Sequence, residues 1–127
     1  MAENKIEQYL IELKYSYREV KPNMWLLDDA ENDLEGVIVM YDEPLVIFRT
    51  QIMNTPKENK LEFYKKLLEL NAKDMIHGAY GLEGDKVVIV NTMEYESLDF
   101  SEFRAALDAI SMALVQHYPI LSVYREK

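Results

Sequence analysis

Residues 36–49 read Gly-Val-Ile-Val-Met-Tyr-Asp-Glu-Pro-Leu-Val-Ile-Phe-Arg, and this stretch decides the fold class. Its two apolar runs, 37–41 and 45–48, are rich in β-branched residues, which favour strands. Only three residues separate the runs, and so short a connection joins antiparallel neighbours, because a parallel crossover needs about a dozen residues or more. The stretch therefore predicts two adjacent strands of an antiparallel meander.

On the N-terminal side of this hairpin, the acidic stretch 28–33 predicts a turn that leads back to a short strand at 25–27. Before that strand, apolar residues recur at helical spacing over residues 4–17. Asn4 can cap this helix together with Glu7, in an Asn variant of the capping box. A first helix followed by three strands is therefore expected.

On the C-terminal side, Thr55, Pro56 and Glu58 predict a helix start, because Thr caps, Pro suits the first turn and Glu completes a capping box. The helix should run to about residue 71. The remaining predicted elements are strands at 76–82 and 86–93 and a last helix that begins at Asp99, is capped by Glu102 and ends near His117. We expect an α+β fold, with an antiparallel β-sheet packed by three helices in the order α-β-β-β-α-β-β-α, as one domain over residues 1–127.

The apolar runs of the predicted strands lack the alternation expected when one face of an antiparallel sheet meets water. Three short helices could cover one face, so something else would have to cover part of the other. The central helix also has apolar residues around about half its circumference, wider than one core contact needs. We expect Leu61, Tyr64 and Leu68 to face the sheet. This arrangement would leave Phe63, Leu67 and Leu70 as a candidate dimer or partner interface, although a helix wedged within its own chain gives the same pattern.

The charge balance restricts the possible partners. The chain has 14 Lys and Arg against 23 Asp and Glu, a net charge of −9, and no cysteine. Such a chain repels phosphate backbones and anionic membranes, so neither nucleic acid nor a membrane is expected as a partner. An acidic surface would attract basic segments of a protein or peptide. No signal peptide and no apolar run of about 20 residues is visible, and a cytoplasmic location is expected.

Motifs that carry chemistry are incomplete. Asp29, Glu31 and Asp33 alternate as calcium ligands do, but Leu34 stands where an EF-hand loop needs Gly, so an acidic turn is preferred. Gly78, Gly81 and Gly84 lead into a strand, whereas a phosphate-binding loop opens a helix. The isolated histidines, His77 and His117, lack metal-ligand spacing, and His117 is expected to be packed or helix-terminal. We expect no catalytic residue, no cofactor and no metal.

Several short motifs resemble the YbjN-like family, whose members are also called bacterial sensory transduction regulators. The similar segments are Trp25-Leu26-Leu27 leading to Gly36-Val37-Ile38-Val39, Thr55-Pro56 opening a helix that ends in Leu70-Asn71, Gly78-Ala79, and Leu98-Asp99 opening the last helix. They cover residues 25–114. The resemblance implies a fold similar to type III secretion chaperones, which are commonly dimeric, acidic proteins that hold segments of secreted proteins. It implies no reaction and no catalytic residues.

Three functions remain open at this point. The first is a non-enzymatic polypeptide-binding module, chaperone-like or regulatory, that acts as a homodimer and uses exposed sheet surface and apolar helix faces. The second is a small-molecule-binding regulator with a pocket between sheet and helices. The third is an enzyme that uses a pair of carboxylates, because such pairs form in space and leave no sequence motif.

Overall fold

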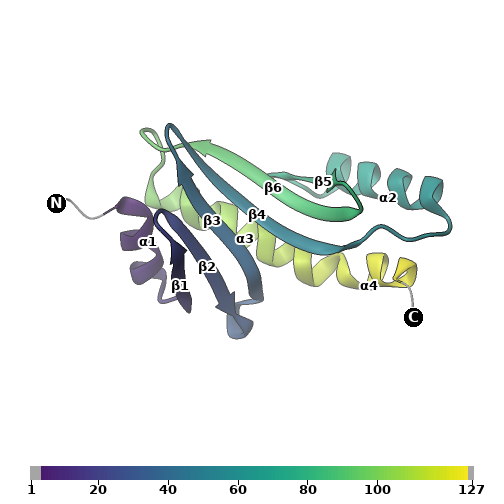
Figure 1. The fold of residues 1–127 in the computed structure, drawn as a ribbon, viewed down its shortest axis with the longest axis horizontal. Coiled ribbons are helices and arrows are strands. Elements are labelled where there is room, and N and C mark those ends of the chain that lie inside the picture. The colour runs from purple at the N-terminus through teal and green to yellow at the C-terminus, as the bar shows by residue number, and fades with distance from the viewer. Residues whose placement is uncertain (1–3, 126–127) are drawn as a thin grey trace.

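The computed structural model describes residues 4–125 of the chain, which form a six-stranded sheet with helices packed against it (Figure 1). The helices are α1 (Lys5–Leu13), α2 (Lys60–Lys73), α3 (Phe100–Gln116) and α4 (Tyr118–Leu121), with short 3-10 helices η1 (Ala30–Asn32) and η2 (Ser122–Tyr124). The strands are β1 (Tyr17–Lys21), β2 (Met24–Asp29), β3 (Leu34–Asp42), β4 (Leu45–Asn54), β5 (Ala79–Glu83) and β6 (Lys86–Glu94). The predicted fold class, an antiparallel α+β sheet packed by helices, is confirmed. No helix among residues 4–125 is long and apolar enough to cross a bilayer.

The sheet is antiparallel throughout, in the order β1-β2-β3-β4-β6-β5. The predicted hairpin of residues 36–49 is the pair β3–β4, with Val39 opposite Phe48 and Asp42 opposite Leu45. Strand β6 returns between β4 and the edge strand β5. The strands that the central apolar runs form are therefore the inner ones, where both neighbours satisfy the backbone hydrogen bonds.

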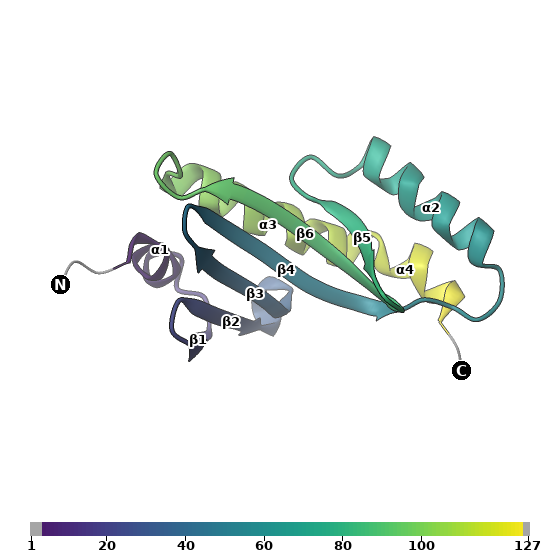
Figure 2. The same cartoon turned by 45° about the horizontal axis from the view of Figure 1, so that its top comes forward.

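The core lies on one face of the sheet, between the strands and the helices α1 and α3. Figures 1 and 2 show α3 running behind the strands, with α1 at one end and α2 beside β5. Phe48 and Phe103 meet there with ring centroids 5.5 Å apart. The predicted capping box of α3 is present: Asp99 accepts from the Glu102 backbone N–H at 2.8 Å, and Glu102 accepts from the Asp99 N–H at 3.1 Å. The helix ends with His117 as its C-cap, where the sequence predicts its end.

The first helix is shorter than predicted, because the chain leaves it at Lys14 and begins an additional strand, β1, at Tyr17. Lys14 adopts a left-handed conformation, with φ of 59°. The backbone of Ser16 then pairs with β2: its N–H donates to Asp29 Oδ2 at 2.8 Å, and its carbonyl accepts from the Asp28 N–H at 3.1 Å. Tyr17 therefore belongs to the edge strand β1. Its spacing from the apolar residues of α1 also fits a helix, so spacing alone does not distinguish a strand residue from the end of a helix here.

The central helix begins later than predicted. Thr55 does not cap it, because the Thr55 N–H donates to the Asp85 carbonyl at 2.7 Å and continues the pairing of β4 with β6. Helix α2 begins at Lys60, after Asn59, which has φ of 59° and makes no side-chain capping bond. Pro56 is buried in the connection that crosses from the sheet to the helix.

Candidate functional site

The apolar residues of α2 are placed opposite to the prediction except for Tyr64, which was predicted to face the sheet and is partly buried against the core. Phe63, Leu67 and Leu70 are buried, each no more than 6% exposed, whereas Leu61 is 85% and Leu68 is 68% exposed. Phe63 packs edge-on against the Tyr124 ring of η2, with centroids 5.1 Å apart. The expectation that Phe63, Leu67 and Leu70 form an interface is therefore wrong in its geometry. They belong to the core of the chain, while Leu61 and Leu68 form the outer face of α2.

Two features fix the docking of α2. Asn71 brackets the backbone of Tyr80 on β5: its side chain accepts from the Tyr80 N–H at 2.7 Å and donates to the Tyr80 carbonyl at 3.2 Å. At the other end, Tyr124 Oη donates to Glu62 Oε1 at 3.0 Å. The helix is therefore held beside the edge strand β5 and the C-terminal η2, a position that the helical spacing of its leucines does not specify.

The face of the sheet away from the core has no helix over it in the described chain (Figure 1). Half-exposed apolar side chains occupy neighbouring strands on this face, where the register places Leu26 opposite Ile38 and Met40 opposite Ile47. We call this surface the open sheet face; it consists of Leu26, Ile38, Met40, Ile47 and Val90. The expectation that helices cover only one face of the sheet is met, and the apolar runs that lacked alternation contribute to both faces.

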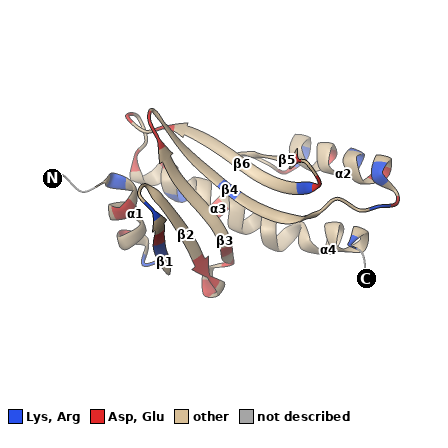
Figure 3. Cartoon of the chain, in the orientation of Figure 1, with Lys and Arg blue, Asp and Glu red and all other residues tan. Residues whose placement is uncertain are grey.

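Charges are separated along the same strands. At one end of β4 and β6 the exposed acids are Asp42, Glu43, Glu94 and Glu96, and Leu45 pairs with Glu94. At the opposite end Asn54 pairs with Lys86. Figure 3 shows acidic residues in the loops at the first end and at the turn between β2 and β3, and basic residues at the start of β6 and on α2. Strands β4 and β6 therefore have an acidic end and a basic end, while the turn between β2 and β3, which lies at the same end of the sheet as Lys86, carries Asp28, Glu31, Asp33 and Glu35.

An ion pair lies within the open sheet face. Arg49, which lies between Ile38 and Val90 in register, pairs with Glu83 at the end of β5, and Arg49 Nε donates to Glu83 Oε2 at 3.2 Å. The hydrogen bond from Arg49 lowers the pKa of Glu83 below its ordinary value. Both groups are partly exposed, so the pair contributes little to stability, but it neutralises the carboxylate.

The one histidine near the core is part of a buried polar chain. His117 is 2% exposed, its Nδ1 lies 2.6 Å from Tyr80 Oη, and its Nε2 lies 3.1 Å from Asp74 Oδ2. Burial raises the pKa of Tyr80, and the nearby Asp74 raises it further. A tyrosine that acts as a base or nucleophile needs a lowered pKa, so this arrangement favours structural linkage of α2, β5 and α3 over catalysis. The predicted packed, helix-terminal histidine is confirmed.

Tyr80 should make stability fall at high pH. In the unfolded chain a tyrosine loses its proton near pH 10, whereas buried Tyr80 keeps its proton to higher pH. The unfolded state therefore releases a proton that the folded state holds, and the free energy of unfolding decreases as pH rises above about 10. Tyr80→Phe should reduce this decrease and cost about 1 kcal/mol at pH 7 through the lost hydrogen bond. Urea titrations at several pH values measure both effects.

A matched control for this experiment is Tyr118→Phe, which removes the hydroxyl of a tyrosine that is 58% exposed. It should retain the stability of the unmodified protein at neutral pH. Equal loss of stability in both variants at neutral pH, or an unchanged alkaline decrease in Tyr80→Phe, would contradict the role assigned to Tyr80.

The residues that the sequence raised as ligand candidates have structural roles. Asp29 accepts from the Ser16 and Asn32 N–H groups, and the bond from Ser16 lowers its pKa. Gly78 has φ of 84°, and a Cβ there would lie 2.8 Å from the Val90 carbonyl oxygen, so close strand pairing requires glycine. Within residues 4–125 no three His, Asp or Glu side chains are grouped as metal ligands.

The chain matches one family in sequence. The sequence pattern of the CesT_Tir_1 family matches residues 1–127. No curated protein matches the chain in sequence.

Solved structures of similar fold include chains of two protein complexes. One chain of the heterodimeric ExoU–SpcU complex from the type III secretion system of Pseudomonas aeruginosa has a TM-score of 0.74 and 14% identity, over 93% of this chain and 98% of that chain. YbjN from E. coli has a TM-score of 0.65 and 14% identity, over 91% and 90%. A chain of the ExsC–ExsE complex has a TM-score of 0.54 and 12% identity, over 98% and 97%. The fold that the resemblance implied is confirmed.

Proposed function

The chain belongs to the CesT_Tir_1 family, and from this premise we propose that it is a non-enzymatic, chaperone-like or regulatory protein that binds other polypeptides in the cytoplasm as a homodimer. Two of the structures that share its fold were solved as complexes of two different proteins, ExoU with SpcU and ExsC with ExsE. Fold likeness alone does not transfer a function. The proposal rests on the surface described above.

The open sheet face is the observation that carries this proposal. Its apolar side chains come from four neighbouring strands and surround Arg49, in contrast to apolar residues scattered singly over a protein. Burying apolar surface stabilises association by about 25 cal/mol per Å². An extended polypeptide that lies across the strands would cover these side chains, while the acidic end of β4 and β6 would attract a basic segment of that partner.

The outer face of α2 supports the homodimer. Leu61 and Leu68 are seven residues apart, so they lie two turns apart on the same side of the helix. Two exposed leucines in this arrangement form the centre of a helix–helix contact between two copies. In a two-fold dimer the same patch is used by both subunits, so each leucine contributes twice.

The binding proposal is tested by photo-crosslinking in the native cytoplasm. A photoreactive phenylalanine analogue in place of Ile47, on the open sheet face, should form adducts with polypeptides other than the chain itself. The same analogue in place of Arg104, an exposed residue of α3, is the control and should not. Adding Ile38→Lys should abolish the adducts at Ile47, because an unpaired charge within an apolar contact is unfavourable. Adducts at both positions, or at neither, would contradict a polypeptide site on this face.

The small-molecule alternative finds no support in the space between the sheet and the helices. The cavity there is lined by Thr50, Tyr80, His117 and Leu121 among others, and its volume is about 90 Å³. Sites for drug-sized ligands are usually about 300 to 1,000 Å³. This cavity is therefore too small for such a ligand, and the proposed function is recognition on the surface.

A further inference from the structure

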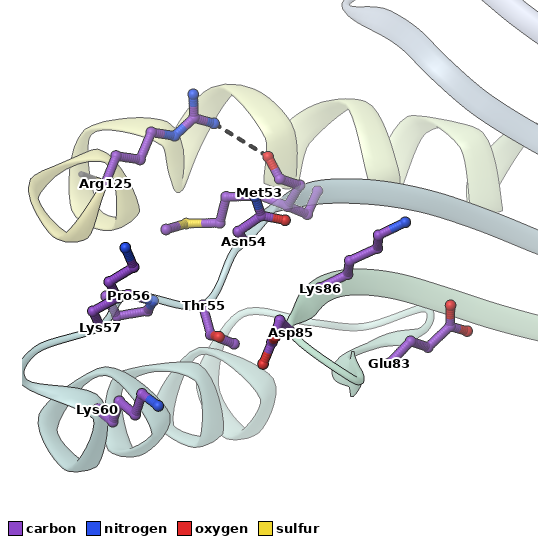
Figure 4. A pocket seen from close by; sticks show the side chains of 11 residues that line it. Met53, Asn54, Thr55, Pro56, Lys57, Lys60, Glu83, Asp85, Lys86 and Arg125 are labelled. Carbon is purple, nitrogen blue, oxygen red and sulfur yellow. Dashed lines mark hydrogen bonds between the residues drawn. The ribbon is translucent and has the colours of Figure 1, made fainter. Parts of the chain in front are cut away.

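A cavity with a volume of about 800 Å³ lies at the basic end of β4 and β6 (Figure 4). The segment that links β4 to α2, the first turn of α2, the β5–β6 turn and the C-terminal Arg125 surround it. Arg125 is held at its rim by a hydrogen bond from Nη2 to the Ile52 carbonyl, 3.2 Å long. A second cleft of about 370 Å³ shares Pro56, Lys57 and Arg125 with it. Together they form a groove, and we call it the cationic groove.

The charge of the cationic groove is opposite to that of the whole protein. Lys57, Lys60, Lys86 and Arg125 line the larger cavity, together with two carboxylates, Glu83 and Asp85, and a third carboxylate, Glu58, lines the second cleft. Arg49 already pairs with Glu83. Around this one cavity lie four of the 14 basic residues of the chain, whose net charge is −9. Of the two carboxylates that line the larger cavity, Asp85 is the one that does not pair with Arg49.

The shape of the groove indicates the kind of anion it suits. Figure 4 shows the four cationic side chains coming from separate segments and spread along the opening, so they do not converge on one point. A single phosphate would be held by donors that converge on it. Between the cations Met53 and Pro56 supply apolar surface, next to the polar side chains of Asn54 and Thr55. An extended chain whose carboxylates are spaced on either side of an apolar residue fits both features.

A long polyanion fits less well. Charges further apart than about 8 Å are largely screened at physiological ionic strength. The cations of the groove therefore attract mainly the negative charges that lie within the groove. A nucleic acid would extend beyond the groove over the acidic remainder of the protein, whereas a short peptide segment would not.

We propose that the cationic groove binds an acidic, extended segment of a partner polypeptide, with its carboxylates on Lys60, Lys86 and Arg125 and an apolar side chain over Met53 and Pro56. This inference rests on the proposed polypeptide-binding function and adds the chemistry of a second part of the partner. It also differs from the sequence-based expectation, which assigned only basic segments to the partner.

The test uses a fluorescent peptide of about ten residues, about 33 Å long when extended, with glutamates on both sides of a central leucine. Fluorescence anisotropy measures its binding to the whole protein, and a companion peptide carries glutamine for each glutamate. The glutamate peptide should bind more tightly than the glutamine peptide, although the net charge of the protein repels it. Raising the salt from about 0.01 M to about 0.15 M should weaken binding several-fold, because the Debye length falls from about 30 Å to about 8 Å.

Two matched double variants locate the site. Lys60→Gln with Lys86→Gln changes two exposed lysines of the groove and should weaken binding of the glutamate peptide about tenfold. Lys65→Gln with Lys73→Gln removes the same charge from exposed positions of α2 outside the groove and should change binding less than twofold.

Equal binding of the two peptides, or equal loss in the two double variants, would overturn the proposal. Tighter binding of a single-stranded oligonucleotide than of the glutamate peptide would overturn the choice of a polypeptide. Failure of the peptide to bind, while crosslinking at Ile47 still captures polypeptides, would reject the groove and leave the proposed function standing. Failure of both experiments would reject both.

Discussion

Replacing Phe63 and Leu70 together with glutamate is expected to unfold the protein. Both side chains lie in the core, 0% and 6% exposed, so the substitutions would place two carboxylates where no described cation is paired with them. A buried unpaired charge costs several kcal/mol, and a domain of this size is stable by about 5 to 15 kcal/mol. Circular dichroism should show loss of the cooperative thermal transition at neutral pH.

The control for that experiment makes the same chemical change on the same helix. Leu61→Glu with Leu68→Glu alters two leucines that are 85% and 68% exposed, and the monomer should stay folded. Surface substitutions usually change stability by less than about 0.5 kcal/mol. If the Phe63→Glu, Leu70→Glu variant folds, or if the control unfolds, the orientation of α2 is the one predicted from the sequence and not the one in the structure.

The same Leu61→Glu, Leu68→Glu variant should be monomeric, in contrast to a dimeric unmodified protein. Each subunit would contribute two glutamates to the contact at the two-fold axis. Four unpaired charges would then lie in one apolar contact. A loss of about 4 kcal/mol is expected, which weakens the dimer about a thousandfold. Light scattering coupled to size exclusion should give twice 14.9 kDa for the unmodified protein and 14.9 kDa for the variant.

Two results would contradict this prediction in different ways. An unmodified protein that is monomeric at micromolar concentration would end the homodimer proposal. A variant that remains dimeric would exclude the outer face of α2 and place the subunit contact on the open sheet face, which would then compete with a partner for the same side chains.

Local signals predicted the elements whose causes are local. The hairpin of residues 36–49 is specified by a three-residue connection between two β-branched runs, and no tertiary contact is needed to favour it. The start of α3 is specified by Asp99 and Glu102, which bond to each other's backbone within one turn. Both features formed where the sequence predicts them.

Elements whose causes lie far away in the chain were mispredicted. Thr55 is an adequate helix cap, but its N–H pairs with the carbonyl of Asp85, 30 residues later in the sequence. The N–H of Ser16 donates to the carboxylate of Asp29, and strand β1 begins at the next residue where a helix was predicted to continue. Tertiary hydrogen bonds of this kind override local propensity, and a single sequence does not reveal which partner will be near.

The sequence predicted which kinds of surface the protein has, but not which residues form them. Apolar runs without alternation indicated an uncovered sheet face, and the face described here contains such side chains from four strands. The leucines of α2 indicated a helix with two apolar sides, but its outer side is set by contacts with Tyr124 and the Tyr80 backbone. The cationic groove left no motif, because its four basic residues are brought together only by the fold.

The two ends of β4 and β6 differ in charge. This difference distinguishes one end of these strands from the other, although antiparallel strands run in both directions. Strand β4 has 10 residues, so its acidic and basic ends are about 30 Å apart. A segment of some ten extended residues spans that distance, and its lysines and glutamates meet opposite charges in one orientation but like charges in the reverse orientation. If a polypeptide binds along these strands, two peptides of identical composition and opposite residue order would differ in affinity, and the sheet would distinguish the polarity of the bound chain.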